Sequence, residues 1–95
     1  MSEYRAPIIL PGQVYYREDN NTYLVVTGKN GEMVSYVGQP SNGVLGYRGR
    51  LEDEDFINLY QPVDPRDLER EEKDELLSFC LPGTSLKMGY IKEET

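Results

Sequence analysis

The sequence predicts a small fold that is mainly β with an α-helical appendage, an α+β domain built on a bent antiparallel sheet. Short runs of β-favouring residues alternate with turn-forming residues through the first 51 positions. Asn30-Gly31 joins two of these runs and suits a tight hairpin turn. After Leu51 the chain becomes acidic, and Asp64-Pro65 suits the start of a helix.

The length of 95 residues fits a single domain, which we place at 1–95. Hydrophobic residues make up 38% of the chain and charged residues 28%, which is typical of a globular domain. The local patterns divide it into a β-rich sheet over 1–51, a short helix or strand over 52–63, an acidic helix over 64–81 and a final strand over 84–92.

Three strands are expected before position 38. Gln13–Arg17 is rich in β-favouring side chains, and Thr22–Thr27 contains a continuous apolar run that suggests a central strand covered on both faces. Glu32–Val37 is the expected return strand, with Val34 and Tyr36 on one face and Met33, Ser35 and Val37 on the other. Because glycine adopts positive φ without steric cost, and asparagine does so more easily than most residues, Asn30-Gly31 is expected to form a primed or bulged turn.

A loop and a fourth strand follow this hairpin. Gly38–Gly43 is dense in turn formers and is expected to be a loop, whereas Val44–Leu51 is expected to be a strand. Gly46 and Gly49 lie inside that strand and suggest a bulge or sharp bend.

The next segment allows two interpretations. Four acidic residues precede an apolar group, and acids favour a helix N-terminus, so a short helix over Glu52–Asn58 is expected, with Phe56 docked on the sheet. A strand over Phe56–Val63 is the alternative.

A longer helix is expected over Pro65–Cys80, ending before Pro82-Gly83. Cys80 is the single cysteine, and we interpret it as a small buried hydrophobic residue near the end of this helix. The alternation of apolar residues after it predicts a final strand over Ser85–Ile91 that pairs back onto the sheet.

The stretch "PGQVYYREDNNTYLVVTGKNGEMVSYV" resembles the opening hairpins of SH3-like barrels, including the small ones of bacteria and phages. The resemblance covers about residues 10–50 and consists of Gly, then Val-Tyr, then Tyr-Leu-Val-Val, then a turn and a return strand. It implies an SH3-like barrel as an alternative to the open bent sheet. The peptide-binding aromatic residues of eukaryotic SH3 domains have no counterparts that can be placed in this sequence, so the resemblance implies no function.

Charge is distributed unevenly along the chain. Residues 1–50 contain four acids and five bases, for a net charge of +1, whereas residues 51–95 contain thirteen acids and five bases, for a net charge of −8. Duplex nucleic acid is usually bound by a basic surface that neutralises phosphates. We therefore expect no direct binding of duplex nucleic acid, and a protein partner with a basic surface.

The residue inventory argues against catalysis. The chain contains no histidine, which excludes a Ser-His-Asp triad, a Cys-His dyad and histidine-ligated metals, and one cysteine cannot form a thiolate zinc site. The glycines of "GVLGYRG" lack the lysine and helix of a phosphate-binding loop. We expect a protein that is not an enzyme and binds no cofactor or metal.

No run of residues approaches the ~20 apolar positions of a membrane helix, and the N-terminus lacks the hydrophobic region of a signal peptide. We therefore expect a cytoplasmic protein that does not contact a membrane.

The leading functional hypothesis is a small adaptor or regulator that binds a basic partner through its acidic half. Phe56 or Tyr60 is expected to serve as an apolar anchor. The expected acidic contacts are Glu52, Asp53, Glu54, Asp55, Glu69, Glu71, Glu72 and Glu75. A solvated helix face is the alternative interpretation of these charges, supported by the favourable helix spacing of Glu69 with Lys73 and of Arg70 with Asp74.

Two other functions remain open. In one hypothesis the carboxylates imitate a phosphate backbone, as in a phage-type inhibitor that is a DNA mimic, which requires acids spread over an extended surface. Alternatively, Tyr47, Arg48 and Arg50 contact RNA or DNA, since arginine and tyrosine stack on bases. A homodimer is also left open.

Overall fold

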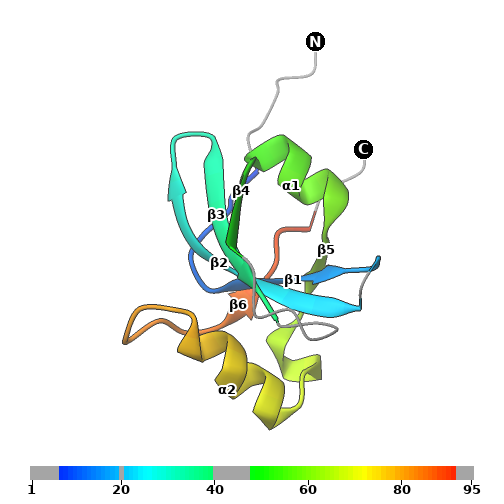
Figure 1. Cartoon of the computed structure of the whole chain (residues 1–95), viewed down its shortest axis with the longest axis vertical. Helices are drawn as coiled ribbons and strands as arrows, with labels where there is room; N and C mark the ends of the chain where they lie inside the picture. The colour runs from blue at the N-terminus through cyan, green and yellow to red at the C-terminus, as the bar shows by residue number, and fades with distance from the viewer. Residues whose placement is uncertain (1–6, 20, 40–47, 92–95) are drawn as a thin grey trace.

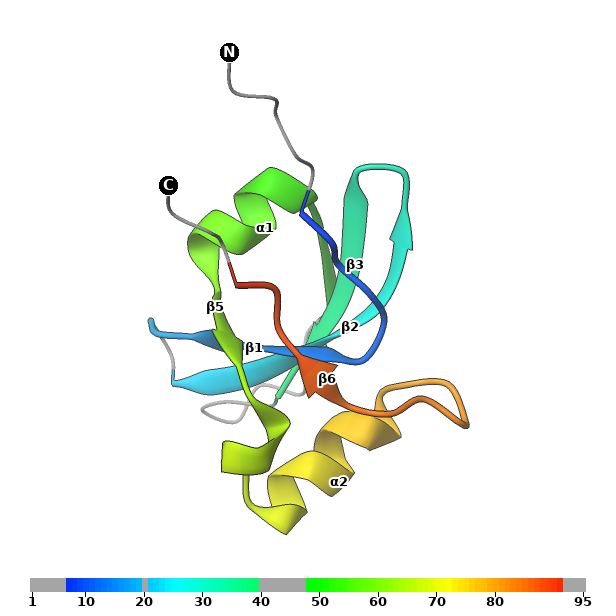
Figure 2. The same cartoon turned by 180° about the vertical axis from the view of Figure 1, so that it is seen from behind.

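The computed structural model describes residues 7–19, 21–39 and 48–91. In these ranges a six-stranded sheet has the order β4-β3-β2-β1-β5, with β6 paired to β1 (Figure 1). Helices α1 and α2 lie at opposite ends of the molecule in both ribbon views (Figure 2). The elements are β1 (Gln13–Arg17), β2 (Thr22–Asn30), β3 (Met33–Gly38), β4 (Arg48–Glu52), α1 (Asp53–Leu59), β5 (Gln61–Val63), the 3₁₀ helix η1 (Pro65–Asp67), α2 (Arg70–Ser78) and β6 (Lys87–Met88).

The predicted hairpin is present and longer than expected. Strands β2 and β3 pair antiparallel up to Asn30 opposite Met33, so the connection has two residues. Gly31 has φ +63°, the positive value that a primed turn requires, and nothing lies within 4 Å of where its Cβ would be. The register shifts between Val26 and Gly28, which places a bulge within β2.

One face of the sheet is closed by an aromatic cluster beneath α1. The Phe56 ring lies between those of Tyr15, Tyr36 and Tyr60, at centroid distances of 4.7, 5.4 and 5.0 Å. Such edge-on and tilted contacts are the geometries that aromatic rings favour. Leu24, Val26 and Val34 complete this core. The helix expected over Glu52–Asn58 is therefore confirmed, and a short strand, β5, follows it.

The other face of the sheet packs against α2 and the segment that precedes it. Val14 of β1 and Val25 of β2 form a second cluster with Leu68 and Leu76. Leu76 is the buried residue of α2, and Leu68 lies between η1 and α2.

The single helix predicted over Pro65–Cys80 is wrong, because the segment is broken at Leu68. Asp64 accepts a hydrogen bond from the Arg66 amide and caps η1, as expected for Asp64-Pro65. Leu68 then has extended backbone and is 6% exposed, and Glu69 begins α2 through a reciprocal capping box with Glu72. At this break Leu68 packs against the sheet with Val14 and Val25.

The sheet is mixed and open, which corrects two expectations. Strand β6 pairs parallel with β1, Gln13 opposite Lys87, so the sheet is not purely antiparallel. The final strand predicted over Ser85–Ile91 is limited to Lys87–Met88. In the described part of the chain the sheet order ends at β4 and β5 with no pairing between them, so the sheet does not close into a barrel.

Gly49 has a role different from the bend that was predicted. Strands β3 and β4 pair in continuous register from Met33 opposite Glu52 to Val37 opposite Arg48. Gly49 lies opposite Tyr36, and a Cβ at Gly49 would lie 2.4 Å from the Tyr36 hydroxyl. The glycine leaves room for the tyrosine ring. Gly46 and the first four positions of Val44–Leu51, like most of the Gly38–Gly43 loop, lie outside the described residues.

Candidate functional site

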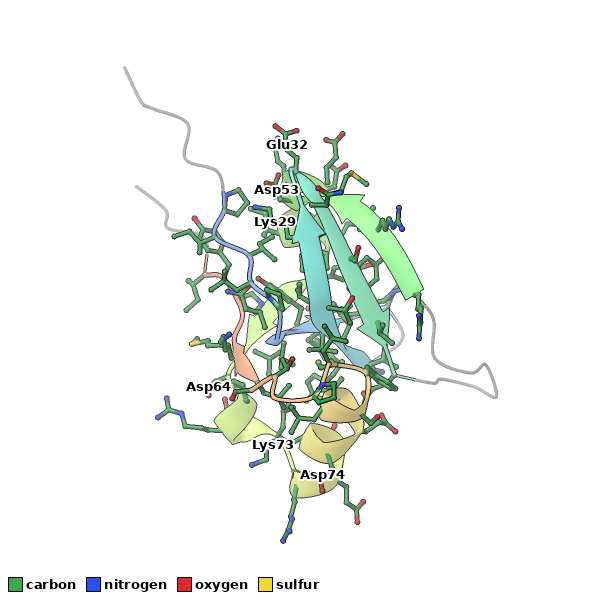
Figure 3. The ribbon with its side chains drawn as sticks, turned by 90° about the vertical axis from the view of Figure 1, so that its left-hand side faces the viewer. Lys29, Glu32, Asp53, Asp64, Lys73 and Asp74 are labelled. Carbon is green, nitrogen blue, oxygen red and sulfur yellow. The ribbon has the colours of Figure 1, made fainter. Side chains whose placement is uncertain are left out.

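The acidic residues at the start of α1 have different environments. Asp53 is 5% exposed, its carboxylate lies 3.5 Å from the Lys29 ammonium, and its backbone N–H donates to the Glu32 carbonyl at 2.7 Å (Figure 3). Glu52, Glu54 and Asp55 are exposed. Asp53 therefore connects α1 to the β2–β3 hairpin. The prediction that Asp53 is a surface contact is wrong, because its side chain is buried.

The expected apolar anchors are also buried. Phe56 is fully buried and Tyr60 is 7% exposed, and the Tyr60 hydroxyl lies 3.2 Å from that of Tyr36. Neither side chain is available to a partner in this structure, which corrects their assignment as binding residues. The apolar pattern after the acids in this segment indicated docking on the sheet, and that interpretation is the correct one.

Several acids of α2 form contacts within the fold. The side chains of Glu69 and Glu72 each accept a hydrogen bond from the other's backbone amide, and Glu75 accepts one from Gln39 at 2.8 Å. The Glu71 and Asp74 carboxylates are exposed and have no ion pair or hydrogen bond within the described residues.

The expected pairing of charges along α2 is absent. Neither Glu69 with Lys73 nor Arg70 with Asp74 forms an ion pair in the part of the chain that the structure describes. Positions 71 and 74 are opposite the buried Leu76 on the helix, because successive residues are rotated by about 100°. Glu71 and Asp74 thus project from the outer side of α2.

The predicted acidic contacts do not form one patch. Asp53 and Glu32 are at one end of the molecule, whereas Asp64 and Asp74 are at the other (Figure 3). The sheet separates α1 from α2 (Figure 1). Two acidic groups result, one from Glu52, Glu54 and Asp55, and one that we call the α2 acidic face, defined as Glu71 and Asp74.

Asp64 is an acid whose charge is satisfied locally. The Arg66 guanidinium donates to its carboxylate at 2.8 Å, and this pairing holds the pKa of Asp64 below its usual range. Asp64 therefore adds little uncompensated charge to the neighbouring α2 acidic face.

The sequence did not predict a groove beside the sheet. It has a volume of about 710 Å³ and is bounded on one side by β3 and β4 and on the other by the segment after α2. The groove lies beside the part of the sheet that α2 does not cover. It forms between segments that are far apart in the sequence. Its lining includes Ser35, Val37, Arg48, Arg50, Phe79 and Leu81. Tyr47, predicted with these arginines as a nucleic-acid contact, lies outside the described residues.

Cys80 also lines the groove but is not activated. Its thiol is half-buried and lies 3.5 Å from the Leu76 carbonyl oxygen, and burial raises its pKa. A raised pKa leaves less of the thiolate, which is the nucleophilic form. The packing interpretation of Cys80 is consistent with this environment.

Within residues 7–19, 21–39 and 48–91, no three histidine, cysteine or carboxylate side chains gather as a metal site would require. No helix in the same residues has the length and apolar character needed to cross a bilayer. No family model, curated protein or solved structure matches the chain.

Proposed function

We propose that this domain is an adaptor or regulator that binds another protein, with the α2 acidic face contacting a basic surface of that partner. The observation that carries the proposal is the outer side of α2, where Glu71 and Asp74 are exposed and form no ion pair with any described residue. Charges held this way attract a basic surface over several ångströms and raise the association rate.

The fold supports this use of α2. The helix is fixed to the sheet by Leu76 and started by its own capping box, so its outer side is presented on a structured element. Glu69 and Glu72 form that capping box, and Glu75 binds Gln39. Of the four α2 glutamates predicted as contacts, Glu71 is therefore the one without a hydrogen bond to a described residue.

The test uses the double variant Glu71→Gln/Asp74→Asn, which preserves size while removing two charges. Glu54→Gln/Asp55→Asn at the α1 end is the matched control, since it removes the same charge from exposed positions. A protein captured from host lysate by the wild-type chain is identified by mass spectrometry and purified for stopped-flow kinetics. We expect the α2 variant to associate about tenfold more slowly at low salt, and the control to match the wild type. Equal rates for all three proteins would contradict the proposal.

Mimicry of a phosphate backbone is a second candidate function. The observation that favours it is the separation of the two acidic groups to opposite ends, since a mimic needs carboxylates over an extended surface. In the same experiment a mimic requires both variants to slow association, and the captured partner to be a nucleic-acid-binding protein. An effect confined to the α2 variant supports the adaptor instead.

A further inference from the structure

The groove beside β3 and β4 is not used by the proposed function, and its charge is opposite to that of the α2 acidic face. Arg48 and Arg50 line one side of it. Both are exposed, and neither forms an ion pair or side-chain hydrogen bond with another described residue. Two unpaired guanidinium groups in a groove of this size suit an anionic ligand.

The directions of these side chains follow from the pairing of β4. Gly49 faces Tyr36 on the core side, and successive residues of a strand point to opposite faces. Arg48 and Arg50 therefore both point to the other face, where Val37 and Ser35 are their cross-strand neighbours. Guanidinium groups two residues apart match carboxylates two residues apart on an extended peptide.

The backbone of β4 is also available. In the described sheet β4 is the last strand and pairs with β3 on one side only. The Asp53 N–H donates to the Glu32 carbonyl, and antiparallel pairing alternates inward and outward groups along the strand. The N–H and C=O groups of Arg48 and Arg50 therefore point away from β3, toward the free edge.

We propose that an acidic, extended peptide segment of another protein adds as a strand to the free edge of β4, with its carboxylates paired to Arg48 and Arg50. Main-chain hydrogen bonds to the edge supply part of the affinity, as in other β-augmentation complexes. The Arg48 and Arg50 side chains select acids at alternating positions. Phe79 and the 77% exposed Leu81 form the opposite wall of the groove and shield these ion pairs from water.

Charge favours this occupant over a second copy of the chain. A two-fold pairing of β4 strands with Arg48 opposite Glu52 would give two attractive pairs but would also place Arg50 opposite its own counterpart, a repulsive pair. An acidic peptide instead places a carboxylate opposite each arginine, with no repulsive pair. A nucleic-acid strand carries no alternating N–H and C=O groups with which to pair the outward backbone groups of β4, whereas an extended peptide carries both.

The experiment measures fluorescence anisotropy of a labelled peptide of four Glu-Val repeats. We expect saturable binding that weakens as salt is raised, and at least tenfold weaker binding of an uncharged Gln-Val peptide of equal length. Arg48→Gln/Arg50→Gln should lower the affinity at least tenfold, whereas Arg70→Gln, an exposed arginine at the start of α2, should leave it unchanged. Ser35→Glu provides a second variant, because a carboxylate beside Arg50 would compete with the peptide.

Strand addition is tested by the same peptide carrying N-methyl groups on alternate backbone amides, which removes donors without altering its charge. We expect its affinity to fall at least tenfold. The proposal is overturned if the Glu-Val peptide does not bind, if the arginine variant binds it equally well, or if N-methylation has no effect. It is also overturned if sedimentation shows that the chain dimerises through β4, or if single-stranded oligothymidylate binds at Arg48 and Arg50 in place of the peptide.

Discussion

One face of the sheet is sealed by the aromatic cluster beneath α1, whereas α2 covers the other face over β1 and β2 and leaves it open over β3 and β4. The sealed face buries Tyr15, Phe56 and Tyr60 without a charged member in its core cluster. The open face bears Arg48 and Arg50 beside a groove. In our proposal the groove on the open face binds a ligand, so stability and binding would depend on opposite faces of the same sheet. The two sides should therefore respond differently to substitution.

The largest difference is expected from truncating the central side chain of each face. Phe56→Ala should lower the free energy of unfolding by about 3–5 kcal/mol, because the ring is fully buried among three tyrosines. Leu76→Ala should cost about 2–3 kcal/mol, the lower part of its range, because α2 borders an open groove and can settle toward the sheet. Urea unfolding measures both, and equal losses would remove the distinction between the faces.

Alkaline pH should weaken the sealed face through Tyr15. Burial raises the pKa of Tyr15 from 10.0 to about 12, so the folded protein favours the neutral phenol. This difference in pKa contributes about 2–3 kcal/mol to the free energy of unfolding. The contribution is complete below pH 10 and is lost as the pH rises toward 12.

Tyr15→Phe isolates this effect. The phenol accepts a hydrogen bond from the Tyr90 N–H at 2.7 Å and donates one to Gln13 at 3.0 Å. The variant should therefore be less stable than wild type at pH 9 by about 1–3 kcal/mol. The gap between the two proteins in urea unfolding should close by pH 12, and a gap of constant size would refute the assignment to Tyr15.

Glycine substitutions sharpen the comparison within the sheet. Gly49→Ala places a Cβ against the Tyr36 ring in the sealed core and should destabilise the fold by about 1–3 kcal/mol. Gly28→Ala is the matched control, because no atom lies within 4 Å of its Cβ position, and it should change stability by no more than about 0.5 kcal/mol. Thermal unfolding of the two variants separates them, and a neutral Gly49→Ala would show that Tyr36 is free to move.

The hairpin turn depends on backbone conformation and not on either face. Gly31→Val should cost about 1–2 kcal/mol, because a β-branched residue is strained at φ +63° while its side chain meets no neighbour. Gly31→Asn should cost much less, because asparagine tolerates positive φ. If valine and asparagine gave the same thermal midpoint, strain would not explain the glycine.

The smallest effect is expected on the outer side of α2. Glu71→Gln/Asp74→Asn should change the free energy of unfolding by no more than about 0.5 kcal/mol, because neither carboxylate has a partner within the described fold. Glu69→Ala should cost about 1 kcal/mol by removing the cap of α2. Urea unfolding measures both variants. A larger loss of unfolding free energy for Glu71→Gln/Asp74→Asn than for Glu69→Ala would contradict this ranking.

Local signals in the sequence predicted the strands and the turn of the first half. The apolar run after Thr22 and the Asn30-Gly31 pair were sufficient, because hairpin pairing joins residues close in sequence. The break at Leu68 was missed because Asp64-Pro65 gave a strong helix start, while the need to bury Leu68 depends on Val14 and Val25.

The candidate sites were predicted less well than the strands. The sequence shows which residues are acidic. It does not show that they lie at two opposite ends of the molecule, because that depends on the order of the strands and helices in the fold. Asp53 differs from Asp55 by its burial and by its proximity to Lys29, and both come from packing against the β2–β3 hairpin. The groove is formed by β3, β4 and the segment after α2, and no local pattern marks it.

The parallel pairing of β6 with β1 imposes a delay on folding during synthesis. Gln13 pairs with Lys87, residues whose numbers differ by 74 (87 − 13). A ribosome adds about 5–20 residues per second, so β1 emerges about 4–15 s before its partner. The β2–β3 hairpin needs about 1–10 μs once its residues are available. For several seconds, therefore, the nascent chain can pair β1, β2 and β3 with one another while β1 still lacks β6.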